Sequence, residues 1–191
     1  MKIGLYFGSF NPIHTGHLII ANHILNAGLI DKLWFVISPQ NPFKKSNSLL
    51  NEYDRLHLVR VATEDDLRIN VSDVEFHLEK PSFTSQTLIY LAEKYPDHDF
   101  SVIIGSDSYQ NLHQWKNGDF MMKHYQFIIY PRPGFEIQGE LAPNMHLLPD
   151  APLLSISSTH VRNTIKDGKS IRYMVPNAVF EEIEANRFYK K

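Results

Sequence analysis

Short apolar runs recur along the chain, and between most of them lie longer stretches in which apolar residues follow helical spacing. A nearly continuous apolar run of this length is typical of a strand that is buried on both faces of a parallel sheet. The longer stretches have the length that a crossover helix needs between two parallel strands. The pattern therefore predicts strands at residues 3–7, 32–38, 67–71, 74–78, 99–104, 126–130 and 145–148.

Five amphipathic stretches are predicted as helices, and several carry a signal at one end. Gly28 follows the first stretch and Gly168 follows the fifth, and a glycine is a natural stop for a helix. Ser82 is expected to cap the start of the third. The five stretches lie at residues 18–25, 51–64, 81–95, 106–115 and 157–167.

Strands and helices alternate almost throughout, so the predicted fold is α/β, a doubly wound parallel sheet with right-handed crossovers. The chain has 191 residues, which is enough for one real core. We expect a single domain over residues 1–191, with a small C-terminal helical part at about 155–191.

Composition and charge narrow the function classes. Apolar residues make up 43% of the chain and charged residues 21%, which is ordinary for a globular enzyme. The 19 basic and 21 acidic residues give a net charge of −2, so a polyanion would have to be held by local positive features. The chain has no cysteine, and no apolar run approaches the ~18 residues of a membrane span. We therefore expect a cytoplasmic protein that binds neither nucleic acid nor a membrane.

The most informative stretch is 8–18, where a glycine turn follows the first strand and leads into a helix. His14 and His17 stand three positions apart at the mouth of that helix, so they share a face. The first helical turn leaves free N–H donors and the positive end of the helix dipole, which together make an anion site. Two imidazoles add donors that can carry charge, so the stretch predicts phosphate binding.

Other interpretations of the same stretch stay open from the residues alone. The glycine turn could serve only tight packing, and either histidine could be structural. A His-x-x-His pair could also bind zinc, although no cysteine or acidic residue lies between Gly8 and Leu18 to complete such a site.

Three further stretches carry candidate chemistry at the ends of predicted strands. Lys44 and Lys45 lie in the loop 39–48, at the sheet edge where ligands bind in open α/β folds, although such lysines are often only solvated. Asp107 follows a glycine after the strand 99–104 and could accept from ribose hydroxyls, hold a metal through water or cap a helix. Small hydroxyl residues start the helix that carries Arg162, which could equally be a surface arginine.

The stretch 8–17 closely resembles the Gly-x-Phe-x-Pro-x-His-x-Gly-His motif of the nucleotidyltransferase superfamily of adenylyl- and cytidylyltransferases. All six fixed positions match, at Gly8, Phe10, Pro12, His14, Gly16 and His17. Residues 156–162 match in full the Ile-Ser-Ser-Thr-x-x-Arg motif of the superfamily. The resemblance runs from Lys2 to about Tyr189 and implies a Rossmann-like nucleotidyltransferase fold, in which the two motifs hold ATP from opposite sides.

A second resemblance concerns the other substrate. Residues 80–88 resemble the Pro-Ser-Tyr-Thr-x-x-Thr-Leu segment of nicotinate mononucleotide adenylyltransferases, where the helix start offers backbone N–H groups to the pyridine carboxylate. Phe83 replaces the tyrosine, and Gln86 replaces a usual aspartate, which leaves the polar support of the segment open. The Leu-x-x-Trp of this family is present at 112–115, so Trp115 would stack on the pyridine ring, with core packing as the alternative.

The resemblance implies a set of site residues. The implied catalytic residues are His14, His17, Lys44 and Arg162. The implied ATP-binding residues are Gly8, Ser9, Phe10, His14, His17, Gly105, Asp107, Ile156, Ser157, Ser158 and Arg162. The implied mononucleotide-binding residues are Ser9, Lys44, Thr84, Trp115 and Arg132. No residue is expected to ligate a metal directly, because Mg²⁺ would be held by the ATP phosphates.

The implied reaction is adenylyl transfer from ATP to nicotinate mononucleotide, which gives nicotinate adenine dinucleotide and pyrophosphate in NAD biosynthesis. The attacking phosphate is already an anion, so no general base is required. The expected partners are therefore ATP and a pyridine mononucleotide, and assembly into a homo-oligomer is left open. The alternatives are an enzyme that also accepts nicotinamide mononucleotide, a phosphopantetheine adenylyltransferase, and a non-catalytic nucleotide-binding module.

Overall fold

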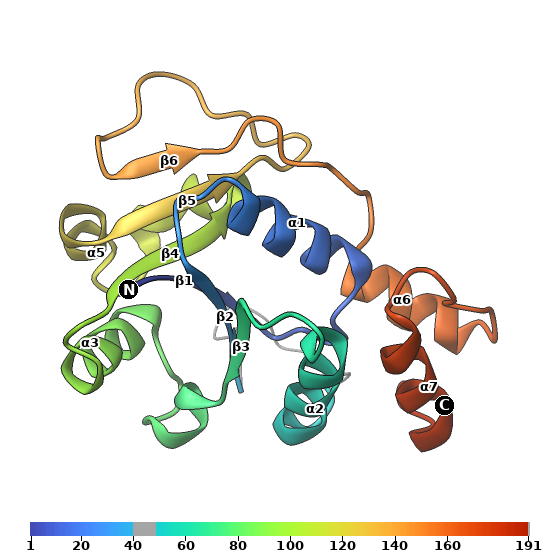
Figure 1. Cartoon of the computed structure of the whole chain (residues 1–191). Helices are drawn as coiled ribbons and strands as arrows, with labels where there is room; N and C mark the ends of the chain where they lie inside the picture. The colour runs from blue at the N-terminus through green and yellow to red at the C-terminus, as the bar shows by residue number, and fades with distance from the viewer. Residues whose placement is uncertain (40–48, 191) are drawn as a thin grey trace.

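A single twisted parallel sheet forms the centre of the molecule (Figure 1). The structure is a computed structural model, and it describes residues 1–39 and 49–190. Six strands lie in the order β3-β2-β1-β4-β5-β6, and every pair of neighbours is parallel. Their bounds are β1 Lys2–Gly8, β2 Lys32–Ile37, β3 Ile69–Ser72, β4 Asp99–Gly105, β5 Gln126–Tyr130 and β6 Met145–Leu147. The predicted doubly wound parallel α/β sheet is confirmed.

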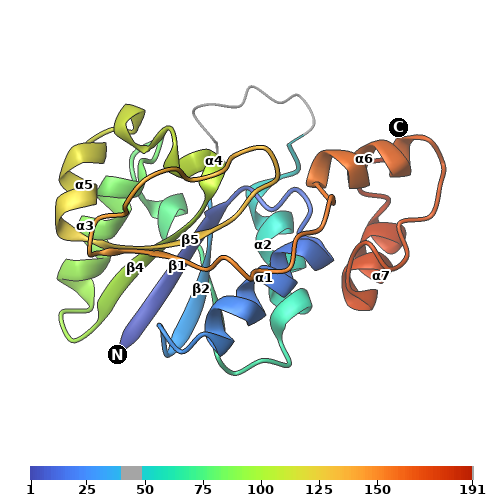
Figure 2. The ribbon, with the colours of Figure 1, turned by 90° about the horizontal axis from the view of Figure 1, so that it is seen from above.

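The apolar runs form strands because both faces of the sheet are covered. On one face, α1 (Thr15–Asn26), α2 (Glu52–Thr63), α6 (Ser158–Lys166) and α7 (Asn177–Asn186) bury their apolar sides in one core layer. On the other face, α3 (Thr84–Lys94), the 3₁₀ turn η2 (Leu112–Gln114) and α5 (Gly118–His124) complete a second layer. Figure 2 shows the two groups of helices on opposite sides of the sheet.

Three predicted elements differ from the structure. Residues 74–78 are not a strand but the 3₁₀ turn η1 (Val74–His77), in which Glu75 turns inward to meet two hydroxyl groups. The helix predicted at 106–115 is broken into the short α4 (Ser106–Tyr109) and η2, and α5 follows without having been predicted. Ser82 does not cap α3, because its hydroxyl donates to Glu75 and the helix begins two residues later.

The C-terminal helices fold back onto the loop that joins β1 to α1. The Ser158 hydroxyl donates to the Pro12 carbonyl at 2.8 Å, and the Thr15 N–H donates to the Met174 carbonyl at 2.9 Å. The Tyr189 hydroxyl donates to the Asn11 side-chain oxygen at 2.8 Å. The loop at the carboxyl end of β1 is therefore held by three contacts from the C-terminal part of the chain. Within the described residues, no helix is long and apolar enough to cross a membrane.

Candidate active site

The loop between β1 and α1 lies where the strand order changes direction, next to β4, which is the usual ligand crevice of a doubly wound sheet. Phe10 has a φ of 42° and is 3% exposed, with its ring packed edge-on against Tyr6, Phe35 and His17. A Cβ on Gly8 would come within 2.8 Å of the Phe10 ring, so a side chain at position 8 would push that ring aside. Phe10, predicted as an ATP contact, has its ring inside the core, where it supports His17.

The two imidazoles stack at the first turn of α1. Their ring centroids are 3.7 Å apart with planes inclined by 22°. The backbone N–H of His14 donates to Nδ1 of His17 at 3.2 Å. That ring nitrogen is therefore an acceptor, and the proton of neutral His17 is on Nε2. His17 thus offers an N–H donor whose tautomer is set by the helix terminus itself.

Both imidazoles are neutral at pH 7 in the protein without ligand. Burial, with a smaller effect from the nearby Arg132, lowers the pKa of His14 to about 4. Burial, His14 and Arg132 together hold the pKa of His17 well below its usual value. The sequence predicted imidazoles that can carry charge, but in this pocket they act first as neutral donors, because burial and the nearby Arg132 guanidinium both disfavour a cation there.

The start of α6 packs beside the loop between β1 and α1 (residues 9–14), called the histidine loop below. The Arg162 guanidinium donates to the Asn11 carbonyl at 2.7 Å and to the Thr159 hydroxyl at 3.2 Å. Ser157 caps the helix by accepting from the His160 N–H at 3.1 Å. A Cβ on Gly16 would lie 3.3 Å from the Ile156 side chain, so that side chain packs close to the glycine of the first motif. The motifs near the two ends of the chain therefore meet in one place, as the sequence analysis predicted.

Across the crevice, β4 and β5 contribute a second polar group. The Arg132 side chain lies 3.5 Å from the Asp107 carboxylate, and it donates to the Tyr130 hydroxyl at 3.0 Å. The Ser106 hydroxyl accepts from the backbone N–H of Arg132 at 2.8 Å. A Cβ on Gly105 would collide with the Asp107 carboxylate, so a side chain at position 105 would push that carboxylate away from Arg132. Arg132, predicted for the mononucleotide, is also close enough to lower the pKa of both histidines.

The residues predicted to bind the nicotinate ring, Thr84 and Trp115, lie at the start of α3 and just after η2. Thr84 is the first residue of α3, and Trp115 follows η2 and packs against the second core layer while remaining partly exposed. The Lys116 ammonium lies 4.3 Å from the centre of the Phe83 ring, which brings the two segments together. Thr84 and Trp115 are therefore neighbours in the fold, and their contact with a ligand stays a prediction.

Comparison with known proteins decides the family. The sequence model of the cytidylyltransferase-like family matches residues 5–164. A protein of Flavobacterium johnsoniae named "Probable nicotinate-nucleotide adenylyltransferase" is 47% identical over 194 residues, covering 100% of both chains. One of the same name from Cytophaga hutchinsonii is 47% identical over 189 residues, covering 99% of this chain and 98% of its own. The chain belongs to the nicotinate-nucleotide adenylyltransferase family.

A solved structure shows the same fold. Nicotinic acid mononucleotide adenylyltransferase of Plasmodium falciparum, in its complex with NaAD, superposes with a TM-score of 0.85 at 23% identity, covering 98% of this chain and 97% of that one. Its complex with APC gives a TM-score of 0.84. The Rossmann-like nucleotidyltransferase fold implied by the resemblance is thus confirmed.

One part of the predicted site lies outside the described residues. Lys44 and Lys45 fall within 40–48, so their predicted role in phosphate binding stays a prediction.

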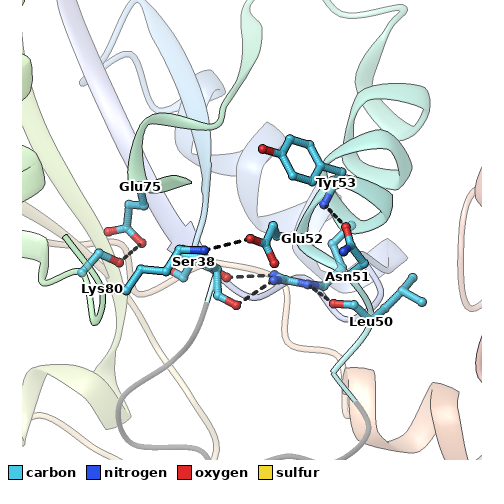
Figure 3. Close-up of polar contacts among 10 residues, drawn as sticks. Ser38, Leu50, Asn51, Glu52, Tyr53, Glu75 and Lys80 are labelled. Carbon is cyan, nitrogen blue, oxygen red and sulfur yellow. Dashed lines mark hydrogen bonds and ion pairs between the residues drawn. The ribbon is translucent and has the colours of Figure 1, made fainter. Parts of the chain in front are cut away.

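Sequence reasoning missed two buried charged residues beside the site. A charged residue in the amphipathic stretch 51–64 is expected on its polar side, but Arg55 is 0% exposed and donates to the carbonyls of Ser9, Ser38, Pro39 and Leu50. Its position three and four residues before Leu58 and Val59 places it on the apolar stripe of α2, which is the signal that could have found it. Glu75 is 2% exposed and was hidden by the strand predicted at 74–78 (Figure 3).

Proposed function

We infer that this protein transfers the adenylyl group of ATP to nicotinate mononucleotide, giving nicotinate adenine dinucleotide and pyrophosphate, a reaction of NAD biosynthesis. The observation that carries this inference is the meeting of the paired imidazoles of α1 with the Arg162 helix around one loop, at the crevice of a doubly wound sheet. The family membership supplies the substrates.

The chemical difficulty is to bring two polyanions together. The attacking phosphate oxygen is already ionised, so the protein has to position it in line with the α-phosphorus and neutralise charge. Positioning of two reactants can supply ~7–11 kcal/mol of a barrier. One fixed donor aimed at developing charge supplies ~3–4 kcal/mol. These magnitudes are sufficient without a covalent intermediate.

His17 is the group proposed to act at the α-phosphate. Of its two ring nitrogens, Nδ1 accepts from the backbone N–H of His14, so Nε2–H is left to donate to a ligand. As charge builds on the transferring phosphate, the neutral imidazole donates without first being desolvated, and the nearby phosphates would raise its pKa.

His14, Arg162 and Lys44 are proposed to hold the β and γ phosphates. The free N–H groups at the start of α1 and α6 would add to this positive field. Ser157, Ser158 and the backbone of 8–10 would then line the same phosphates, with Gly105 and Asp107 toward the ribose. Ser9, Thr84, Trp115 and Arg132 are proposed to bind the mononucleotide.

Mg²⁺ is proposed to arrive with ATP. Within the described residues, no group of three or more histidine and acidic side chains could hold a metal ion. Mg²⁺ commonly keeps several waters and binds through substrate phosphates rather than in an all-protein site, so the ATP phosphates would hold it here. When bound, it would withdraw charge from the leaving pyrophosphate.

A pyrophosphate-release assay tests the proposal. ATP would be supplied with nicotinate mononucleotide, nicotinamide mononucleotide or phosphopantetheine, and release should depend on the first. Equal rates with nicotinate and nicotinamide mononucleotide would indicate a dual enzyme, and release only with phosphopantetheine would contradict the proposal. ATP binding without release would indicate a non-catalytic nucleotide-binding module.

A further inference from the structure

Arg55 joins three separate backbone segments through one buried guanidinium. Within the described residues it donates to the Ser9 carbonyl at 2.6 Å, the Ser38 carbonyl at 2.9 Å and the Pro39 carbonyl at 3.0 Å. Its Nε donates to the Leu50 carbonyl at 2.9 Å. Ser9 belongs to the histidine loop, so the end of β1, the end of β2 and the start of α2 are held at fixed distances from one another.

Glu75 makes the corresponding junction on the other side of β2. Its carboxylate accepts from the Ser82 hydroxyl at 3.0 Å and from the Thr87 hydroxyl at 2.9 Å (Figure 3 draws the region). Both donors belong to the segment that enters α3, and Thr87 is fully buried. Glu75 therefore fixes the start of α3, where Thr84 lies.

The two junctions are connected. The Ser38 carbonyl accepts from Arg55 at 2.9 Å, and the Ser38 side chain is close enough to the Glu75 carboxylate to lower its pKa. Nearer the surface, the Lys80 ammonium contacts the Glu52 carboxylate at 2.9 Å, which ties the same two segments a second time (Figure 3). A continuous polar path thus runs from Ser9 through Arg55, Ser38 and Glu75 to Ser82 and Thr87.

We propose that the buried Arg55 and Glu75, with the half-buried Ser38 between them, form a brace that sets the spacing between the histidine loop and the start of α3. This proposal rests on the proposed function, which seats ATP at the loop and the mononucleotide at α3. The brace residues touch neither substrate, so they are positioning residues. A buried network whose members are all hydrogen-bonded is rigid, and in-line transfer requires the reacting atoms to be held at about 3–3.5 Å.

The affinity for the dinucleotide product reports this spacing. The product occupies the ATP site and the mononucleotide site at once, so its affinity depends on the distance between them. ATP alone and mononucleotide alone each occupy one site. A change in spacing therefore weakens the product more than either substrate. A general loss of stability would weaken all three ligands together.

The experiment compares Ser38→Ala and Glu75→Gln with wild type. Ser38→Ala removes one hydroxyl of the brace and buries no new charge, and Ser38→Thr keeps a hydroxyl and should restore function. Ser101→Ala, at a buried serine of β4 outside the brace, is the matched control. We expect kcat to fall about 10- to 100-fold in Ser38→Ala and Glu75→Gln. Dissociation constants for ATP alone and nicotinate mononucleotide alone should stay within about threefold, while that for nicotinate adenine dinucleotide rises about tenfold.

Two results would overturn the brace. One is an unchanged kcat in both variants, and the other is an equal loss of affinity for all three ligands together with a lowered Tm. If wild-type protein is active and either result is found, only the brace is refuted. If wild-type protein neither releases pyrophosphate nor binds the dinucleotide, the proposed function fails, and the brace's role fails with it.

Discussion

At the mouth of α1, His14 and His17 serve the helix and the ligand site with different atoms. The backbone of His14 and Nδ1 of His17 complete the helix start, where a serine and a glutamate would usually stand. Because that bond occupies only one ring nitrogen, Nε2 of His17 keeps its proton, which in the proposed function it donates to the α-phosphate. A side chain without a ring could cap the helix, but it could not also present a fixed donor on its far side.

Replacing either histidine should therefore remove activity and leave the fold. We expect His17→Ala to lower kcat by about 10²–10³-fold, the usual loss for one donor to developing charge. His14→Ala should also lower turnover by orders of magnitude. His146→Ala, at an exposed histidine of β6, is the control and should stay close to wild type. Kinetics with circular dichroism checks this, and near-wild-type rates in His17→Ala would contradict the assigned role.

Acid should destabilise the ligand-free protein through His14. Its pKa is about 4 in the folded protein and 6.5 in the unfolded chain, so between these values the unfolded chain holds the additional proton. The free energy of unfolding should fall as the pH falls through this window, by up to about 1.4 kcal/mol per pH unit.

Urea unfolding at pH 7 and pH 5 measures this loss. Wild type should lose more stability between the two pH values than His14→Gln, whose side chain does not titrate. His146→Gln provides the comparison for a histidine outside the pocket. Identical losses in wild type and His14→Gln would show that His14 is not the group responsible.

At the scale of elements, apolar periodicity predicted those parts of the chain that are stabilised by burial alone. The six observed strands were all predicted, because continuous apolar runs have few other ways to be buried. The failures fall where a polar group decides the backbone path. The predicted strand 74–78 is instead η1, in which Glu75 is buried, and Ser82 does not cap α3 because its hydroxyl donates to the Glu75 carboxylate. Arg55 was misplaced because a charged residue on an apolar stripe is indistinguishable from a surface one until its carbonyl partners are known.

The break between η2 and α5 depends on a glycine that the sequence pattern did not single out. A Cβ on Gly118 would collide with the main-chain carbonyl of Leu112, which the second core layer holds in place. We expect Gly118→Ala to cost about 1–3 kcal/mol of unfolding free energy, as overpacking does. Because the collision pushes on the turn that carries Trp115, mononucleotide affinity should fall more than ATP affinity.

Gly134→Ala is the comparison for this variant. Gly134 has a φ of +83° and open space around its Cβ position, so alanine there meets strain but no collision. It should destabilise by about 1 kcal/mol and leave both affinities unchanged. If Gly118→Ala unfolds at the wild-type urea concentration, the turn is more adaptable than its packing indicates.

At the scale of the whole molecule, the site is assembled from segments that no local pattern could place together. The histidines follow β1, Asp107 follows β4 and Arg132 follows β5. Arg162 lies in α6, which comes after all six strands in the sequence. The resemblance predicted that the two motifs converge, and the structure confirms this, while the roles of their residues stay predictions. The contacts that hold them could not be predicted, because they are hydrogen bonds between backbone carbonyls and side chains more than 140 positions away, such as Ser158 to Pro12.

These long-range contacts should act together. Tyr189 and Ser158 both hold the 11–12 segment, one through the Asn11 side chain and the other through the Pro12 carbonyl. Tyr189→Phe and Ser158→Ala should each cost about 1 kcal/mol of unfolding free energy, the usual net contribution of one hydrogen bond. Once one contact is lost the loop is already loosened, so the double variant should cost less than the sum, by at least about 0.5 kcal/mol. Ser158→Ala combined with Ser101→Ala, which share no partner, should be additive within about 0.5 kcal/mol. Additive costs in the first pair, with ATP affinity unchanged, would mean that the C-terminal helices merely rest against the loop and do not hold it in shape.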